Sequence, residues 1–249
     1  LKACPVSPAL RVADCAFNTQ QTIAAMQRAA ADGVQLAVFP ELGLTGYTCG
    51  DLFFQQPLQR AAARGLAAVL EASADLDLVA LVGLPVTVDG KLYNCAAVVC
   101  HGKLLGLVPK TYLPNYGEFY ERRQFNPAPA GVRTLHFAGQ EVPFGTQLLF
   151  RCAEMPEFCL GVEVCEDLWA PLPPSTHHAL AGATVIANLS ASDETIGKAD
   201  YRRALVSQQS ARLLCAYLYA DAGHGESTTD MVFAAHDLIC ENGALRAEI

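Results

Sequence analysis

The most informative stretch of the sequence is Gly161-Val162-Glu163-Val164-Cys165-Glu166-Asp167-Leu168-Trp169. Its first half belongs to an apolar run, Phe158–Val164, which has the length of a buried strand. Acidic residues directly after Cys165 favour the first turn of a helix. The stretch therefore predicts a strand that turns into a helix at Cys165. Such a turn exposes its side chain beside backbone N–H groups that have no partner within the helix.

Helices and strands alternate on both sides of this stretch. We expect helices over Thr22–Ala31, Leu58–Ala74 and near Tyr201–Leu214, the first after a capping box formed by Asn18 and Gln21. We expect strands over 34–39, Leu78–Leu84, Phe158–Val164, Thr184–Leu189 and Ala216–Ala220. Asp89-Gly90 and His101-Gly102 predict hairpin turns, and 111–147 an ordered loop with brief strands. This pattern predicts an α/β layered fold with a mixed sheet, and no Ser/Gly-rich linker divides 1–249 into separate domains.

Composition narrows the class of protein. The chain has 249 residues, of which 52% are hydrophobic and 17% charged, as in a soluble globular protein with a large core. No apolar run approaches the roughly 18 residues of a membrane helix. A net charge of −8 argues against a nucleic-acid or anionic-membrane partner, because such binding depends on clustered cations.

The ten cysteines do not indicate a disulfide scaffold. Several stand inside apolar runs, where a thiol behaves as a small hydrophobic group. No CxxC or HxxxH pair occurs, so we expect no metal site, and we expect a cytoplasmic location.

Three residues whose side chains could take part in catalysis follow predicted apolar strands: Glu41, Lys110 and Cys165. Alone, the first two could be ordinary surface charges and the third a packed thiol. Ligand sites in α/β sheets lie beyond the carboxyl ends of strands, which makes the combination more informative than its members. A thiol is weakly ionised at neutral pH. A neighbouring base could take its proton, and a neighbouring cation could stabilise the thiolate that forms.

Three short motifs resemble the signature segments of the nitrilase (carbon–nitrogen hydrolase) superfamily. They are Phe39–Leu42, Pro109–Pro114 and Gly161–Asp167. Four further segments are similar to the glutaminase domain of glutamine-dependent NAD synthetases: Leu44–Tyr47, Tyr116–Glu121, Asn188–Ser192 and Gly225–Asp230. The resemblance covers the chain from about residue 10 to its end and implies a four-layer α-β-β-α sandwich with mixed sheets.

The resemblance also implies roles for single residues. Glu41 corresponds to the general base, Lys110 to the cation that stabilises the oxyanion, Cys165 to the nucleophile and Glu118 to a second, supporting glutamate. It implies glutamine contacts at Tyr116, Glu166, Trp169, Ser192 and Lys198. The last position often carries Arg in relatives, and the two cations bind differently. The Gly-rich run 222–227 lacks the Lys-Ser/Thr ending of a P-loop, so we expect it to line the site.

A glutaminase of this kind would supply ammonia for the ATP-dependent amidation of deamido-NAD. The resemblance implies a downstream synthetase domain that binds ATP, Mg and deamido-NAD, and residues 1–249 carry no phosphate loop for it. We therefore expect no cofactor within these residues, the synthetase domain as a partner, and a homo-oligomer. Two alternatives stay open: a stand-alone amidase or carbamoylase with the same triad, and a catalytically silent interaction module.

Overall fold

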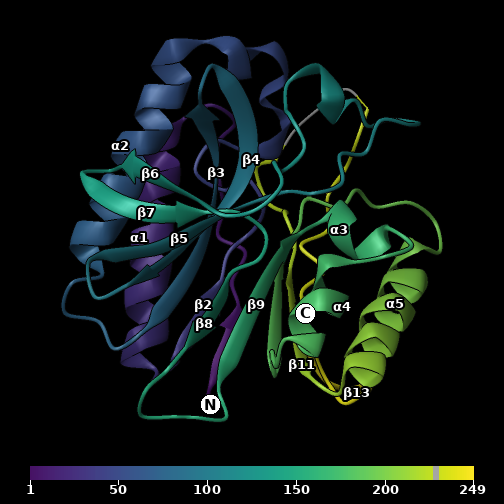
Figure 1. Ribbon diagram of the computed structural model, residues 1–249. Helices are drawn as coiled ribbons and strands as arrows, with labels where there is room; N and C mark the ends of the chain where they lie inside the picture. The colour runs from purple at the N-terminus through teal and green to yellow at the C-terminus, as the bar shows by residue number, and fades with distance from the viewer. Residues whose placement is uncertain (227–229) are drawn as a thin grey trace.

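The computed structural model describes residues 1–226 and 230–249, and Ser227, Thr228 and Thr229 of the motif at 225–230 lie outside the described residues (Figure 1). Within the described ranges, seven strands form a first sheet in the order β1-β2-β3-β4-β5-β7-β6. They are β1 (Ala3–Pro5), β2 (Leu36–Val38), β3 (Val79–Val88), β4 (Lys91–Cys100), β5 (Lys103–Pro109), β6 (Arg133–Phe137) and β7 (Gln140–Phe144). The first three are parallel, and β3, β4 and β5 form antiparallel hairpins at the two predicted turns.

A second sheet has the order β13-β12-β11-β10-β9-β8 in the described part of the chain. Its strands are β8 (Leu149–Arg151), β9 (Cys159–Val164), β10 (Val185–Leu189), β11 (Ala216–Ala220), β12 (Leu238–Glu241) and β13 (Ala244–Glu248). Strands β9, β10 and β11 are parallel, whereas β8, β12 and β13 pair antiparallel. Both sheets are mixed, as predicted.

Helices cover the outer face of each sheet, so that the layers run α-β-β-α (Figure 1). On the first sheet lie α1 (Cys15–Ala31) and α2 (Gln56–Ala72), drawn in purple and blue. On the second lie α4 (Pro174–Leu180) and α5 (Lys198–Leu213), after the short α3 (Glu166–Trp169). Two 3₁₀ segments complete the described chain: η1 (Tyr47–Phe54) between β2 and α2, and η2 (Glu121–Arg123) between β5 and β6. No described helix has the length and hydropathy to cross a membrane.

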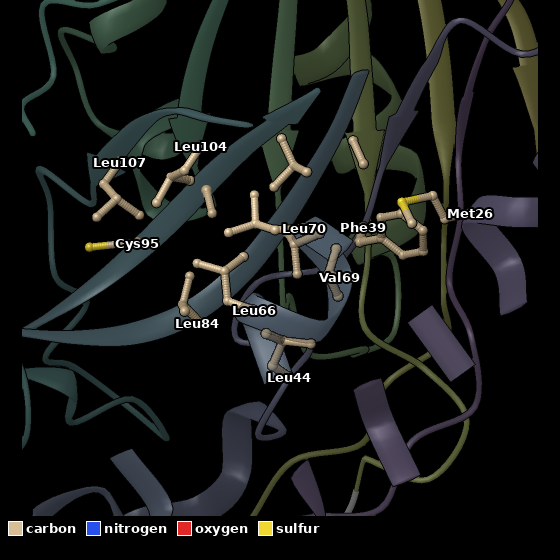
Figure 2. Close-up of a cluster of buried hydrophobic side chains, with 14 of the residues drawn as sticks. Met26, Phe39, Leu44, Leu66, Val69, Leu70, Leu84, Cys95, Leu104 and Leu107 are labelled. Atoms are coloured by element: carbon tan, nitrogen blue, oxygen red, sulfur yellow. The ribbon is translucent and has the colours of Figure 1, made fainter. Parts of the chain in front are cut away.

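The alternation of side chains along β3 builds two separate apolar layers. Ala80, Val82 and Leu84 belong to the apolar layer between this sheet and its helices. Figure 2 shows this layer, with Leu84 near Leu66 of α2. Leu81, between Ala80 and Val82, faces the second sheet. Because successive side chains of a strand point to opposite faces, one strand serves both layers, and its almost unbroken apolar sequence follows from this.

The first helix begins earlier than the sequence predicted. It starts at Cys15, and the Asp14 carboxylate accepts the backbone N–H of Phe17 as its cap. Asn18 does not cap the helix; it lies inside it, buried, and bonds the backbone of Arg11 in both directions. Both residue types favour caps, and the sequence pattern of the capping box selected the wrong one.

Candidate active site

Cys165 stands at the turn between β9 and α3, as the sequence predicted. Its backbone has φ 46° and ψ −102°, a conformation that costs a non-glycine residue about 1–3 kcal/mol. Its N–H donates to the Leu189 carbonyl at 3.0 Å, which ties the turn to the neighbouring strand β10. The side chain is buried, with 5% of the residue exposed. The turn therefore presents a buried thiol in a strained, firmly held backbone.

Glu41 follows β2 and lies between the two sheets. Its backbone N–H donates to the Ser190 carbonyl at 3.2 Å, and its Oε2 accepts the N–H of Ala191 at 3.0 Å. Gly83 of β3 makes this position possible, because a Cβ there would meet the backbone N of Leu42 at 2.3 Å. Only glycine lets the turn approach the strand so closely.

Lys110 directly follows β5 and is completely buried. Its Nζ lies 2.6 Å from Oε1 of Glu41 and 2.5 Å from Oε1 of Glu121. Burial alone would lower the pKa of this ammonium, but the charges of Glu121 and Glu41 raise it well above its ordinary value. Lys110 is therefore a permanent cation held between two carboxylates.

The prediction that Glu118 is the second glutamate is wrong. Glu121 takes that place: it contacts Lys110, and its Oε1 also accepts the hydroxyl of Tyr47 at 2.7 Å. The chain bulges outward after Pro114 and returns at η2, where the Glu121 N–H donates to the Pro114 carbonyl. Glu118 is half-buried and lines the pocket in front of Cys165. Both glutamates belong to the same quoted motif, and nothing in the sequence separates them.

Burial and the charges of this cluster change the pKa of the Cys165 thiol. Burial raises its pKa well above the ordinary value, and the negative charge of Glu41 raises it further, while Lys110 lowers it. The resting group is thus a neutral thiol that needs a base to become a nucleophile. Glu41 is the carboxylate whose charge acts most strongly on it.

An open pocket of about 420 Å³ lies in front of Cys165. The remaining predicted site residues all line it: Tyr116, Glu118, Glu166, Trp169, Ser192 and Lys198. The structure therefore brings together every residue selected from the sequence, Glu118 in a different position from the one expected.

Polar contacts organise the outer part of this pocket. The Tyr116 hydroxyl donates to Oε1 of Glu166 at 3.0 Å. Lys198 Nζ pairs with the carboxylate of Asp193 and lies 5.4 Å from the ring centroid of Trp169. Cations are attracted to the face of an indole ring at such distances. Glu166 and Lys198 thus place a carboxylate and an ammonium group in the lining of the pocket that reaches Cys165.

Sequence reasoning missed two residues that hold the site together, Asn94 and Asp167. The Asn94 amide donates to Oε1 of Glu41 at 2.5 Å, from a position on β4 that carried no signal. Asp167 accepts the N–H groups of Thr111 and Val164, which joins the turn after Lys110 to the turn at Cys165. Burial raises the pKa of Asp167, and the backbone donors oppose that rise. Asp167 is the last residue of the motif Gly161–Asp167, two positions after Cys165, and this position was the one sequence signal that could have indicated its role.

Glu226 belongs to the Gly-rich run expected to line the site. Its carboxylate accepts the backbone N–H groups of Tyr47 and Thr48 at 2.8 and 2.9 Å. It therefore supports the segment that carries the Tyr47 hydroxyl to Glu121. Among the described residues, no group of His, Cys, Asp and Glu is arranged to hold a metal ion.

The chain is similar in sequence to proteins of a known family. The model of the carbon-nitrogen hydrolase family matches residues 4–237. The chain is 48% identical, over 237 residues, to the glutamine-dependent NAD(+) synthetase of Mycobacterium tuberculosis (strain H37Rv), and 44% identical to that of Mycobacterium leprae. Each alignment covers 95% of this chain and 35% of the relative, so the chain spans about a third of the curated relatives it matches.

Solved structures give the same result for the fold. The glutamine-dependent NAD(+) synthetase of Cytophaga hutchinsonii superposes with a TM-score of 0.88 at 29% identity, covering 99% of this chain and 40% of that one. An amidase of Nesterenkonia sp. superposes with a TM-score of 0.76 at 20% identity, covering 99% of this chain and 85% of the amidase.

Proposed function

Because the chain belongs to the carbon–nitrogen hydrolase family, we propose that it hydrolyses the side-chain amide of glutamine and supplies the ammonia for an ATP-dependent NAD synthetase. The observation that carries the chemistry is Lys110, fully buried between Glu41 and Glu121 beside the thiol of Cys165. The relatives named above support glutamine as the substrate.

Glu41 starts the reaction by taking the thiol proton as Cys165 attacks the amide carbon. The carbonyl oxygen gains negative charge, and Lys110 stabilises it; one such donor is typically worth about 3–4 kcal/mol. Glu41 returns the proton to the amide nitrogen, and ammonia leaves. The product is a γ-glutamyl thioester on Cys165. A water molecule, deprotonated by Glu41, then cleaves the thioester to glutamate and restores the thiol.

The outer pocket fits the free amino acid end of glutamine. Lys198 offers a cation for the α-carboxylate, and Glu166, steadied by the Tyr116 hydroxyl, offers an anion for the α-ammonium group. Ser192 and Trp169 line the same space. A substrate held at both ends places its amide carbon at a fixed distance from the nucleophile, which is a large part of catalysis.

The test is glutamate release from glutamine by the purified protein, with a panel of aliphatic amides, nitriles and N-carbamoyl amino acids beside it. We expect glutamine to have the highest kcat/KM. A clear preference for another amide would favour the stand-alone amidase instead. A glutamine-analogue electrophile should add its mass to Cys165 alone, with Cys165→Ala as the control. Labelling spread over several thiols would support the silent module.

The wider setting is part of the same proposal. We assign the binding of ATP, Mg and deamido-NAD to a synthetase domain outside residues 1–249. We propose no cofactor for residues 1–249 themselves. A cytoplasmic location and a homo-oligomer are predictions as well, which fractionation of cells and light scattering of the purified protein would test.

A further inference from the structure

Two residues of the sequence motifs take no part in the proposed proton transfers, although both are completely buried: Glu163 and Asn188. Glu163 is on β9, two residues before Cys165, and Asn188 lies directly opposite Glu163 on β10. A buried carboxylate and a buried amide are costly unless their hydrogen bonds are satisfied. Their partners therefore indicate what they do.

Asn188 holds the backbone of Cys165 from two sides. Its Oδ1 accepts the N–H of Cys165 at 3.0 Å, and its Nδ2 donates to the carbonyl of the same residue at 3.4 Å. This is the residue with φ 46°, in a region that non-glycine residues rarely adopt. Such a conformation persists only where the surrounding structure imposes it.

The orientation of the Asn188 amide is set by its other partners. Ser190 Oγ donates to Oδ1 at 2.8 Å, and Nδ2 donates to the hydroxyl oxygen of Tyr217 at 3.1 Å. The Tyr217 hydroxyl in turn donates to Oε1 of Glu163. The backbone N–H of Cys165 can only donate and its carbonyl can only accept, and the Tyr217 hydroxyl oxygen accepts from the amide nitrogen of Asn188. The oxygen of Asn188 then has to face the N–H of Cys165.

Glu163 is itself anchored to the covering helix layer. Its Oε2 accepts the backbone N–H of Ser175 in α4 at 2.8 Å, and the Ser175 hydroxyl accepts from Gln209 of α5. Glu163, Ser175, Asn188 and Tyr217 are all completely buried. A continuous chain of hydrogen bonds thus runs from the helices through the second sheet to the nucleophile.

We propose that Asn188, oriented by Tyr217 and Glu163, is the positioning residue that keeps Cys165 in its strained, reactive backbone conformation. The inference rests on the proposed function only in taking Cys165 as the nucleophile. Without the amide, the turn loses one of the two acceptors of its N–H and the donor to its carbonyl, and the backbone can relax. The thiol then moves away from Glu41 and the substrate carbon.

The experiment measures alkylation of Cys165 by iodoacetamide, kcat and KM for glutamine, and the thermal midpoint, in the full protein. The variants are Asn188→Ala, which removes the amide, and Tyr217→Phe, which removes only the hydroxyl that orients it. Val206→Ala is the matched control, since Val206 of α5 is completely buried in the same apolar cluster as Tyr217 but makes no part of the hydrogen-bond chain.

We expect Asn188→Ala to slow alkylation and kcat together by at least about tenfold with KM little changed, since small displacements of reacting groups cost rate steeply. Tyr217→Phe should show the same pattern to a smaller degree, and Val206→Ala should lower the thermal midpoint without slowing alkylation. Wild-type alkylation rates in both variants, or losses no larger than those of Val206→Ala at equal stability, would overturn the proposal. If glutamine is not a substrate but alkylation still depends on Asn188, the proposed function fails and the positioning role stands.

Discussion

The inner and outer halves of the site differ in how they are built. The inner half, formed by Glu41, Lys110 and Glu121, is almost completely closed to solvent and fixed by strand ends and charge pairs. The outer half includes Tyr116, which is 58% exposed, and is formed by loop residues and by the starts of α3 and α5 around an open pocket. The difference teaches that chemistry and recognition are separable here: changes inside should act on kcat, and changes outside on KM.

The largest effect should come from removing the nucleophile. Cys165→Ala cannot form the thioester, and we expect turnover to fall by at least about 10⁴-fold, as for other deleted nucleophiles. Glutamine binding, measured by calorimetry, should be retained because the outer pocket is unchanged. Near-normal turnover of this variant would show that Cys165 is not the nucleophile and that the mechanism assigned to the inner half is wrong.

The second-largest effect should come from removing the base, Glu41, or the cation, Lys110. Glu41→Gln and Lys110→Met should each lower kcat by at least about 100-fold, the low end for a proton-transfer group. Turnover and thermal midpoint have to be followed together, because a loss that only tracks unfolding would show that the assigned roles are wrong.

Lys110→Met should also change the dependence of stability on pH. Burial already raises the pKa of Glu121 to about 7, and Lys110 opposes that rise. Without the cation the folded pKa of Glu121 should rise further above its unfolded value, so the free energy of unfolding should keep falling with pH beyond the range in which that of the parent falls. Thermal midpoints of this variant should therefore be lower at pH 8 than at pH 5.5, relative to the parent. An equal deficit at both pH values would contradict the buried charge pairing.

A comparison of the two glutamates sharpens the boundary between the halves. Glu121→Gln weakens the pairing with Lys110 and should lower kcat by about tenfold or more, since the ammonium then lacks one of its charged partners. Glu118→Gln changes only a residue that lines the outer pocket, and kcat should change less than about threefold. The reverse order of effects would restore the assignment made from sequence.

Lys198→Met should raise KM for glutamine by about tenfold with kcat nearly unchanged, because a charged hydrogen bond is worth about 1.5–3 kcal/mol. Lys198→Arg is the matched control and should retain most of the affinity. A loss in kcat equal to that in KM would show that the two halves are not separable at this residue.

The smallest effect is expected at Glu248, a residue outside both halves of the site. Hydrogen bonds from Arg203 and then from His236 lower the pKa of Glu248 to about 2. A carboxyl with a lowered folded pKa stabilises the fold above its unfolded value of 4.5, and the contribution disappears as pH falls from there toward 2. Glu248→Gln should lower the thermal midpoint slightly at pH 7, and the difference should vanish near pH 2. Glutaminase activity should not change.

Much of the fold followed from local patterns. Strands such as β10 and the two hairpins at Asp89 and His101 were predicted closely, because apolar runs and turn residues act over a few positions. Helix starts were less accurate: Asp14, not Asn18, caps α1. A helix cap depends on which of several suitable side chains reaches the free N–H groups, and that depends on the packing of the helix.

Apolar runs and the signature motifs were enough to predict the layered α/β architecture and to select Glu41, Lys110 and Cys165 as the central residues. The three follow strands of both sheets, β2 and β5 of the first and β9 of the second, and ligand sites of α/β folds lie beyond such strand ends. The pairing of Glu121, and not Glu118, with Lys110 and the hydrogen bonds from Asn188 to Cys165 appear only in the folded structure. The first contact depends on the path of the loop after β5, and the second on the register of the neighbouring strands β9 and β10. Packing sets both, and no local sequence pattern encodes them.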